Sequence, residues 1–272
     1  MILTYEKIEE FCKSNRLKLN CGKTHFLVIA SSQRRTHHET EFSIGLGLSE
    51  VVSSIEERVL GIQIGSTLSN WKFQVDYSSR SVIQKCAKKL SGLKLIGNYL
   101  SFKKRRETAQ AVILSRLYYS IEVWGPGITL TQMKALQACL NRTTRWITKN
   151  PLGTTVRRDL LECGFLSINQ TIIFRVLVTG LIALKHGKPE GLKKLLAPPN
   201  HGINTRSSQG VTATRDNYYA NKSWKNKFVK FYNKLPGPLK FADVKKKEEK
   251  DELKLWIETN VVQFPSCSQD ML

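Results

Sequence analysis

The chain has 272 residues, and its 43 lysines and arginines against 22 aspartates and glutamates give a formal net charge of +21. Hydrophobic residues make up 41% of it, enough to form a core, which excludes a protein that is disordered throughout. The excess of positive charge points to a polyanionic partner, most simply nucleic acid, and an anionic membrane surface is the weaker alternative.

Targeting features and cysteines bear on the compartment. No stretch reaches the about eighteen consecutive apolar residues of a membrane span, and acidic residues among the first twelve positions exclude a signal peptide. The six cysteines are scattered and form no C-x-x-C pair, as expected of reduced thiols. We therefore expect an intracellular protein, with nucleus and cytoplasm both open.

The first 65 residues read as one helix followed by strands. Apolar residues near helical spacing predict a helix over 3–15. The run Phe26–Ile29 predicts a buried strand, and two further strand-like pieces cover 41–47 and 58–64.

From about residue 70 the pattern becomes helical. Apolar positions at helical spacing predict a series of amphipathic helices, of which the third ends at Asn150-Pro151 and the next two are joined by Gly164. The positions that define the first three are Ile83, Ala87, Leu90 and Leu93; Ile113, Leu117, Ile121 and Trp124; and Met133, Leu136, Leu140 and Ile147. The fold class predicted is α+β and mainly helical.

The sequence does not match common catalytic motifs, because the required residues are not at the required spacing. Gly22-Lys23-Thr24 lacks the glycine of a phosphate-binding loop, because Leu17 occupies that position. Two-metal nucleotidyl transfer needs clustered carboxylates, yet no two aspartates are adjacent, and the acids of 248–252 lie in a lysine-rich, salt-bridged segment. The sequence predicts no metal site and no cofactor.

Basic clusters are the stronger signal. Residues 80–116 hold ten lysines and arginines against one acid, Glu107. Lys103, Lys104, Arg105 and Arg106 fall where a helix begins, which opposes the helix dipole unless a polyanion is bound. A solvated helix face is the alternative. In the tail, lysines alternate with Trp224 and Phe228, whose spacing favours core packing over base stacking.

A series of loose motifs in a specific order resembles the reverse transcriptases of non-LTR (LINE-type, jockey-like) retrotransposons. Residues 8–29, IEEFCKSNRLKLNCGKTHFLVI, are similar to the late palm of that family, and Val59-Leu60-Gly61-Ile62 to its primer grip. Further similarities are Tyr118-Tyr119…Val123-Trp124-Gly125 to the end of the thumb, and then the segments 136–148, 160–168 and 228–236 to the C-terminal domain.

The resemblance implies a domain order and site residues. The ranges are 1–69 for a late-palm remnant, 70–126 for thumb helices, 127–197 for a helical C-terminal domain, 198–216 for a linker and 217–272 for a basic tail. Lys23 matches the palm lysine near the leaving group, and Leu60 and Gly61 match the primer grip. The implied nucleic-acid-binding residues are Lys103, Lys104, Arg105, Arg106, Arg116, Arg142 and Arg145.

The function implied is that of a C-terminal fragment of an RNA-directed DNA polymerase, with template–primer RNA and DNA as partners. The intact family enzyme uses Mg²⁺, but the catalytic aspartates are expected upstream of Met1, so whether this chain is an enzyme stays open. A stand-alone basic nucleic-acid-binding protein and a helical interaction module are the alternatives.

This chain alone is expected to show no polymerase activity, because it lacks the carboxylate pair that holds two cations in line with a primer end. The measurement is primer extension on a primed template with deoxynucleotides and Mg²⁺ or Mn²⁺. Extension that is lost on chelation would contradict this prediction.

Overall fold

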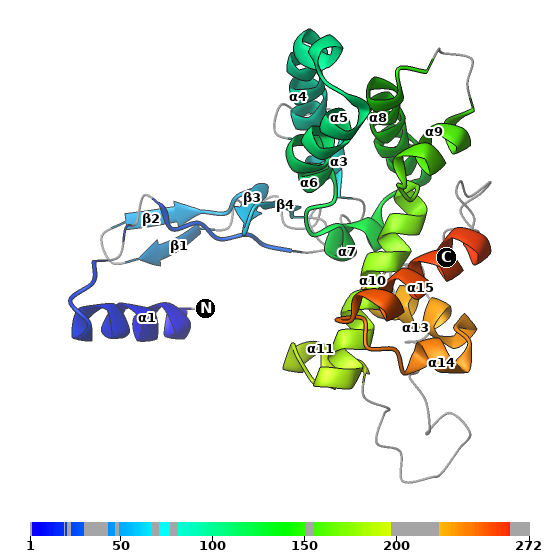
Figure 1. Ribbon diagram of the computed structural model, residues 1–272. Coiled ribbons are helices and arrows are strands. Elements are labelled where there is room, and N and C mark those ends of the chain that lie inside the picture. The colour runs from blue at the N-terminus through cyan, green and yellow to red at the C-terminus, as the bar shows by residue number, and fades with distance from the viewer. Residues whose placement is uncertain are drawn as a thin grey trace. The chain divides into compact units, whose positions relative to one another are not determined.

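The computed structural model describes residues 2–18, 20, 23–29, 43–46, 49–66, 71–76, 81–150, 155–196 and 223–261. The chain divides into two compact units, Met1–Gln74 and Val75–Leu272, each described by itself below (Figure 1). The predicted α+β, mainly helical fold class is confirmed. The predicted linker 198–216 lies outside the described residues, and the predicted domain ranges stay a prediction.

The described part of the first unit contains the helix α1 (Ile2–Ser14), two antiparallel hairpins and most of the short helix α3 (Lys72–Val75). Its strands are β1 (Ser43–Leu46), β2 (Ser49–Val52), β3 (Glu56–Val59) and β4 (Ile62–Gly65). Strand β1 pairs with β2, with Ser43 opposite Val52, and β3 pairs with β4, with Glu56 opposite Gly65. The helix predicted over 3–15 is confirmed.

Two strand predictions are wrong. The buried strand expected at Phe26–Ile29 is only an isolated parallel bridge between Leu27 and Ser54, and the Ile29 side chain is exposed. The single strand expected over 58–64 is a hairpin that reverses at Leu60 and Gly61, with φ of 47° and 88°. A two-residue turn with both φ values positive matches the twist of paired strands, although Leu60 is an unusual residue for it.

The second unit is helical throughout its described part. Its longer helices are α4 (Val82–Ile96), α5 (Phe102–Ala109), α8 (Leu130–Thr148), α9 (Val156–Cys163), α10 (Ile168–His186), α13 (Trp224–Lys234) and α15 (Lys247–Asn260). Its shorter elements are the turns η2 (Gly97–Tyr99), η3 (Gln110–Leu114, π-helical) and η4 (Gly125–Gly127), with α6 (Ser115–Leu117), α7 (Ile121–Trp124), α11 (Glu190–Leu196) and α14 (Gly237–Lys240).

Local sequence explains where the two longest helices begin. Thr129 and Gln132 form a reciprocal capping box at the start of α8, and Ser167 and Gln170 form another at the start of α10. Each box satisfies backbone N–H groups that have no partner within the helix. Gly164, at φ 65°, ends α9 in the left-handed conformation, as expected from the sequence.

The core of the second unit forms around α10, which packs against α7, α8, α13 and α15 (Figure 1). The apolar positions predicted for α8 are buried, as are Ile113, Leu117, Ile121 and Trp124. Helix α10 is the one described helix long and apolar enough to cross a membrane, but 61% of that window is buried, as in the core helix of a globular protein. Phe228 is fully buried, which confirms core packing in the tail.

Gly180→Ala is expected to destabilise the second unit by about 1–3 kcal/mol. A Cβ at position 180 on α10 would overlap the ring of Phe228, and a buried aromatic ring cannot move away without disturbing its neighbours. Denaturant unfolding measures the effect. Gly92→Ala on α4 is the matched control, because a Cβ there meets nothing within 4 Å, so it should be neutral or stabilising.

A pH-dependent contribution to stability is expected from Lys227, which lies buried on α13. Burial, with the nearby charge of Lys230, lowers its pKa from 10.5 to about 8. Between pH 8 and 10.5 the unfolded chain binds more protons than the folded one, so stability rises with pH across that window.

Replacing Lys227 with methionine should remove this titration, so the stability of the variant relative to wild type should fall by roughly 3 kcal/mol between pH 7 and pH 11. The measurement is the difference in unfolding free energy between wild type and variant across pH 7–11. Lys234→Met, at an exposed site on the same helix, should show no such window. A difference that stays constant with pH would contradict the prediction.

Candidate nucleic-acid interface

Helix α5 carries the basic run 103–106, and one of these four side chains points inward. Arg105 is buried, and its guanidinium donates from Nε to the carbonyl of Ile147, at 2.7 Å, and from Nη1 to the carbonyl of Leu100, at 2.6 Å. These carbonyls belong to the end of α8 and to the residue before the N-cap of α5. Arg105 is thus occupied within the fold and cannot offer its guanidinium to a phosphate.

The remaining three side chains, Lys103, Lys104 and Arg106, are exposed, and we call them the α5 cations. The first turn of α5 contains no acidic residue, so the two lysines lie unfavourably near the positive end of the helix dipole. Lys104 forms a surface ion pair with Glu107, at 3.3 Å. The guanidinium carbon of Arg106 lies 5.9 Å from the ring centroid of Phe165, a cation–π contact.

The C-terminal end of α8 contributes a second set of cations. Arg145 Nε lies 3.8 Å from Oδ2 of Asp159, and Asp159 is fully buried and accepts a hydrogen bond from Asn150 at 2.7 Å. This ion pair joins α8 to α9, but neither of its two atoms forms a hydrogen bond. Arg142, one turn earlier, is exposed, and Lys149 ends the helix in the left-handed conformation with its side chain exposed.

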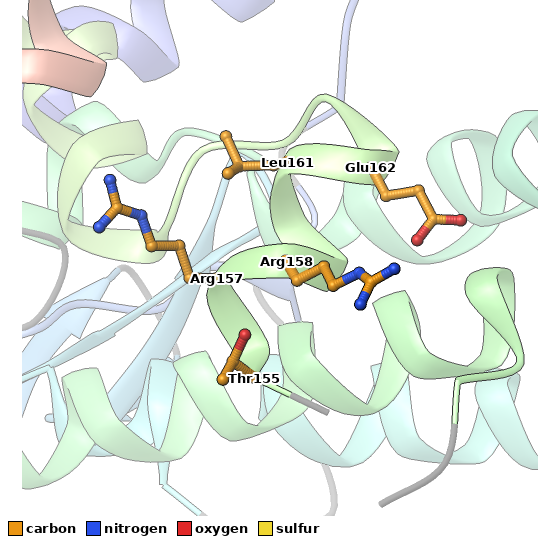
Figure 2. Close-up of a pocket in the computed structure, with 5 residues that line it drawn as sticks. All are labelled: Thr155, Arg157, Arg158, Leu161 and Glu162. Carbon is orange, nitrogen blue, oxygen red and sulfur yellow. The ribbon is translucent and has the colours of Figure 1, made fainter. Parts of the chain in front are cut away.

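Helix α9 adds two exposed arginines at its first turn. A hollow of about 490 Å³ is lined by Thr155, Arg157, Arg158, Leu161 and Glu162. Figure 2 shows that the two guanidinium groups extend to opposite sides of the helix, and that Arg158 extends to the same side as the Glu162 carboxylate. The hollow is therefore of mixed charge and does not form a focused anion site.

Hydrogen bonds and an ion pair join α5, the end of α8 and α9 into one region. Arg105 links the first two, and Arg145 and Asn150 link the last two. Of the site residues predicted from the sequence, the α5 cations, Arg142 and Arg145 lie on these elements. The exposed Arg157, Arg158 and Lys149 add three further cations to this region, and none of them was among the site residues predicted from the sequence.

The other predicted site residues lie elsewhere. Arg116 is exposed on α6, where its charge acts on buried Cys86, and no described contact joins it to α5 or α9. Lys23 is exposed in a short turn of the first unit, where its backbone N–H donates to Asn20 O at 3.0 Å. Leu60 and Gly61 form the β3–β4 turn of the same unit. Their roles stay predictions.

Two of the described thiols, Cys86 and Cys163, are poor nucleophiles or metal ligands. Burial raises the pKa of Cys163 to about 12, and a hydrogen bond with Cys139, together with burial, raises the pKa of Cys86. Thiols with raised pKa values stay protonated and unreactive.

Among the described residues, no group of three His, Cys, Asp or Glu side chains could hold a metal ion. No protein-family model, curated protein or solved structure matches the chain.

Arg105→Ala is expected to destabilise the second unit by about 3 kcal/mol, because two carbonyls would lose charged hydrogen-bond donors. The measurement is the free energy of unfolding in denaturant. The dependence of that free energy on denaturant concentration should be the same in wild type and variant. The neighbouring Lys104→Ala is the matched control and should change stability by less than about 0.5 kcal/mol. Equal effects of the two substitutions would show that Arg105 does not anchor the helix.

Proposed function

We propose that this chain binds RNA and DNA through the surface formed by α5, the end of α8 and α9, as a C-terminal portion of a retrotransposon-type RNA-directed DNA polymerase. The observation that supports the proposal is that the basic side chains of α5 face in two directions. Arg105 fixes the helix from inside, while the α5 cations are left facing solvent at a helix start that disfavours positive charge.

Electrostatics explains why a polyanion is the fitting partner. Lysines in the first turn each cost a few tenths of a kcal/mol, up to about 1 kcal/mol, near the positive end of a helix dipole. Phosphates would offset that cost and the mutual repulsion of the cations. Binding of this kind is driven by counterion release and does not distinguish sequences.

In the family scheme α5 belongs to the thumb, which grips the template–primer backbone, and α8 and α9 belong to the helical C-terminal domain. In this proposal Lys23 and the Leu60–Gly61 turn belong to the late palm, and the chain itself performs no nucleotidyl transfer. An intracellular site of action fits a nucleic-acid partner and free thiols at the four described cysteines.

A helical interaction module is the second candidate, favoured by an exposed apolar tip. At the end of α4 and in η2, Leu95 and Tyr99 are 80% and 89% exposed, which is unusual for large apolar side chains of a globular protein. Binding that ignores salt would favour this candidate over nucleic acid.

The proposal predicts that affinity for duplex falls steeply with salt. If about four to six cations contact phosphates, the slope of log affinity against log salt is roughly −4 to −5. Replacing all three α5 cations with alanine should weaken binding to every sequence equally and make the slope shallower by about 2–3. Fluorescence anisotropy across a salt series measures both quantities.

A control variant that loses the same number of charges distinguishes an effect of the α5 positions from an effect of the lower net charge. Lys193, Lys245 and Lys247 are exposed, on α11 and around the start of α15, toward the C-terminal end of α10. Their triple alanine variant loses the same three charges and should keep most of the affinity and slope. Identical behaviour of the two triple variants, or a wild type whose binding ignores salt, would contradict the proposal.

A further inference from the structure

A second cavity of the described chain lies beside the α5 cations. It has a volume of about 560 Å³, within the range of roughly 300–1,000 Å³ that is typical of ligand pockets. Its walls come from the π-helical turn η3, α6 and the turn after it, α7, the residue after Gly164, and α10. The lining residues are Gln110, Leu114, Ser115, Tyr118, Tyr119, Ser120, Glu122, Phe165 and Arg175.

The backbone around this cavity is irregular in two places. Gln110–Leu114 form a π-helical turn inside an otherwise α-helical segment, and Ser120 adopts φ 49° in the left-handed region. Both conformations are unfavourable for ordinary residues, and π-turns and strained residues concentrate at functional sites. Here they place Gln110 and Ser120 at the wall of the same cavity.

The lining combines aromatic surface with hydrogen-bonding groups. Tyr118, Tyr119 and Phe165 supply three rings. Burial raises the pKa of the Tyr118 phenol, so that ring stays neutral. Gln110, Ser120 and Glu122 offer both donors and acceptors. A flat heterocycle with polar edges matches such a lining, because it can stack on the rings while its edge forms hydrogen bonds.

Positive charge lies on two sides of the cavity. Arg175 lines it directly and is exposed. Arg106 contacts Phe165 at 5.9 Å and lies one helical turn before Gln110, on the same side of the helix. The cavity is thus continuous with the α5 cations through Arg106 and Phe165.

We propose that this cavity holds one base of a single-stranded nucleic-acid segment, whose flanking phosphates lie on Arg106 and Arg175. The inference rests on the proposed nucleic-acid binding and adds a preference for unpaired bases. A paired base cannot enter, because both its stacking faces and its edge are occupied within a duplex.

The test compares two single strands of equal length and charge, one carrying bases and one abasic, bound to the full chain at low salt. One stacked base contributes about 1–3 kcal/mol, so the wild type should bind the strand with bases roughly 5–150-fold tighter. Tyr119→Ala and Gln110→Ala, both at exposed positions, should lower affinity for that strand and leave the abasic strand unchanged.

Tyr99→Ala is the matched control, since Tyr99 is an exposed tyrosine of the same unit that does not line the cavity; it should leave both affinities unchanged. Equal binding of the two strands by the wild type would overturn the base pocket and leave phosphate binding standing. Binding of neither strand would overturn the proposed function and this inference with it. A loss caused by Tyr99→Ala but not by Tyr119→Ala would overturn the pocket and place the base at the tip of α4.

Discussion

The basic surface depends on one buried cation. The guanidinium of Arg105 joins the carbonyl of Leu100, just before its own helix, to the carbonyl of Ile147, at the end of α8. The last carbonyls of a helix carry its negative partial charge, so a buried guanidinium is well matched there. The two bonds also fix the rotation of α5 about its axis. Since successive side chains on a helix differ by about 100°, fixing Arg105 inward determines that its neighbours Lys104 and Arg106 point away from the core.

Elements that depend on local interactions could be predicted from the sequence, whereas elements that depend on pairing with a neighbouring segment could not. The helices α4, α8 and α10 followed from the periodicity of their apolar residues, because that pattern is local. The Phe26–Ile29 run was misread, because a short apolar segment becomes a strand only when a neighbour pairs along it, and here only Leu27 finds a partner, Ser54. The hairpin at Leu60–Gly61 was read as one strand because leucine is a poor signal for a left-handed turn.

The candidate site shows the same limit. A basic run is visible in any sequence, yet its members are not equivalent. Arg105 differs from Arg106 through its buried partners, of which Ile147 lies 42 residues away in the sequence. Spacing did hold a signal, since Phe102, Arg105 and Ala109 fall at i, i+3 and i+7 and share the inward face of α5. The cavity had no such signal, because its wall combines a π-helical turn, a left-handed serine and Arg175 of α10.

The α5 cations and the cavity would contribute to binding in different ways. Cations that contact phosphates add affinity without selectivity, because every nucleotide carries the same charge. Selectivity between paired and unpaired strands needs a concave, partly apolar site that rewards an exposed base face. The contact between Arg106 and Phe165 is where the two meet, since one residue belongs to the α5 cations and the other to the cavity wall. In the binding mode proposed above, a strand whose phosphates follow α5 would place its next base in the cavity, and Arg105 would keep α5 in position because it ties that helix to α8.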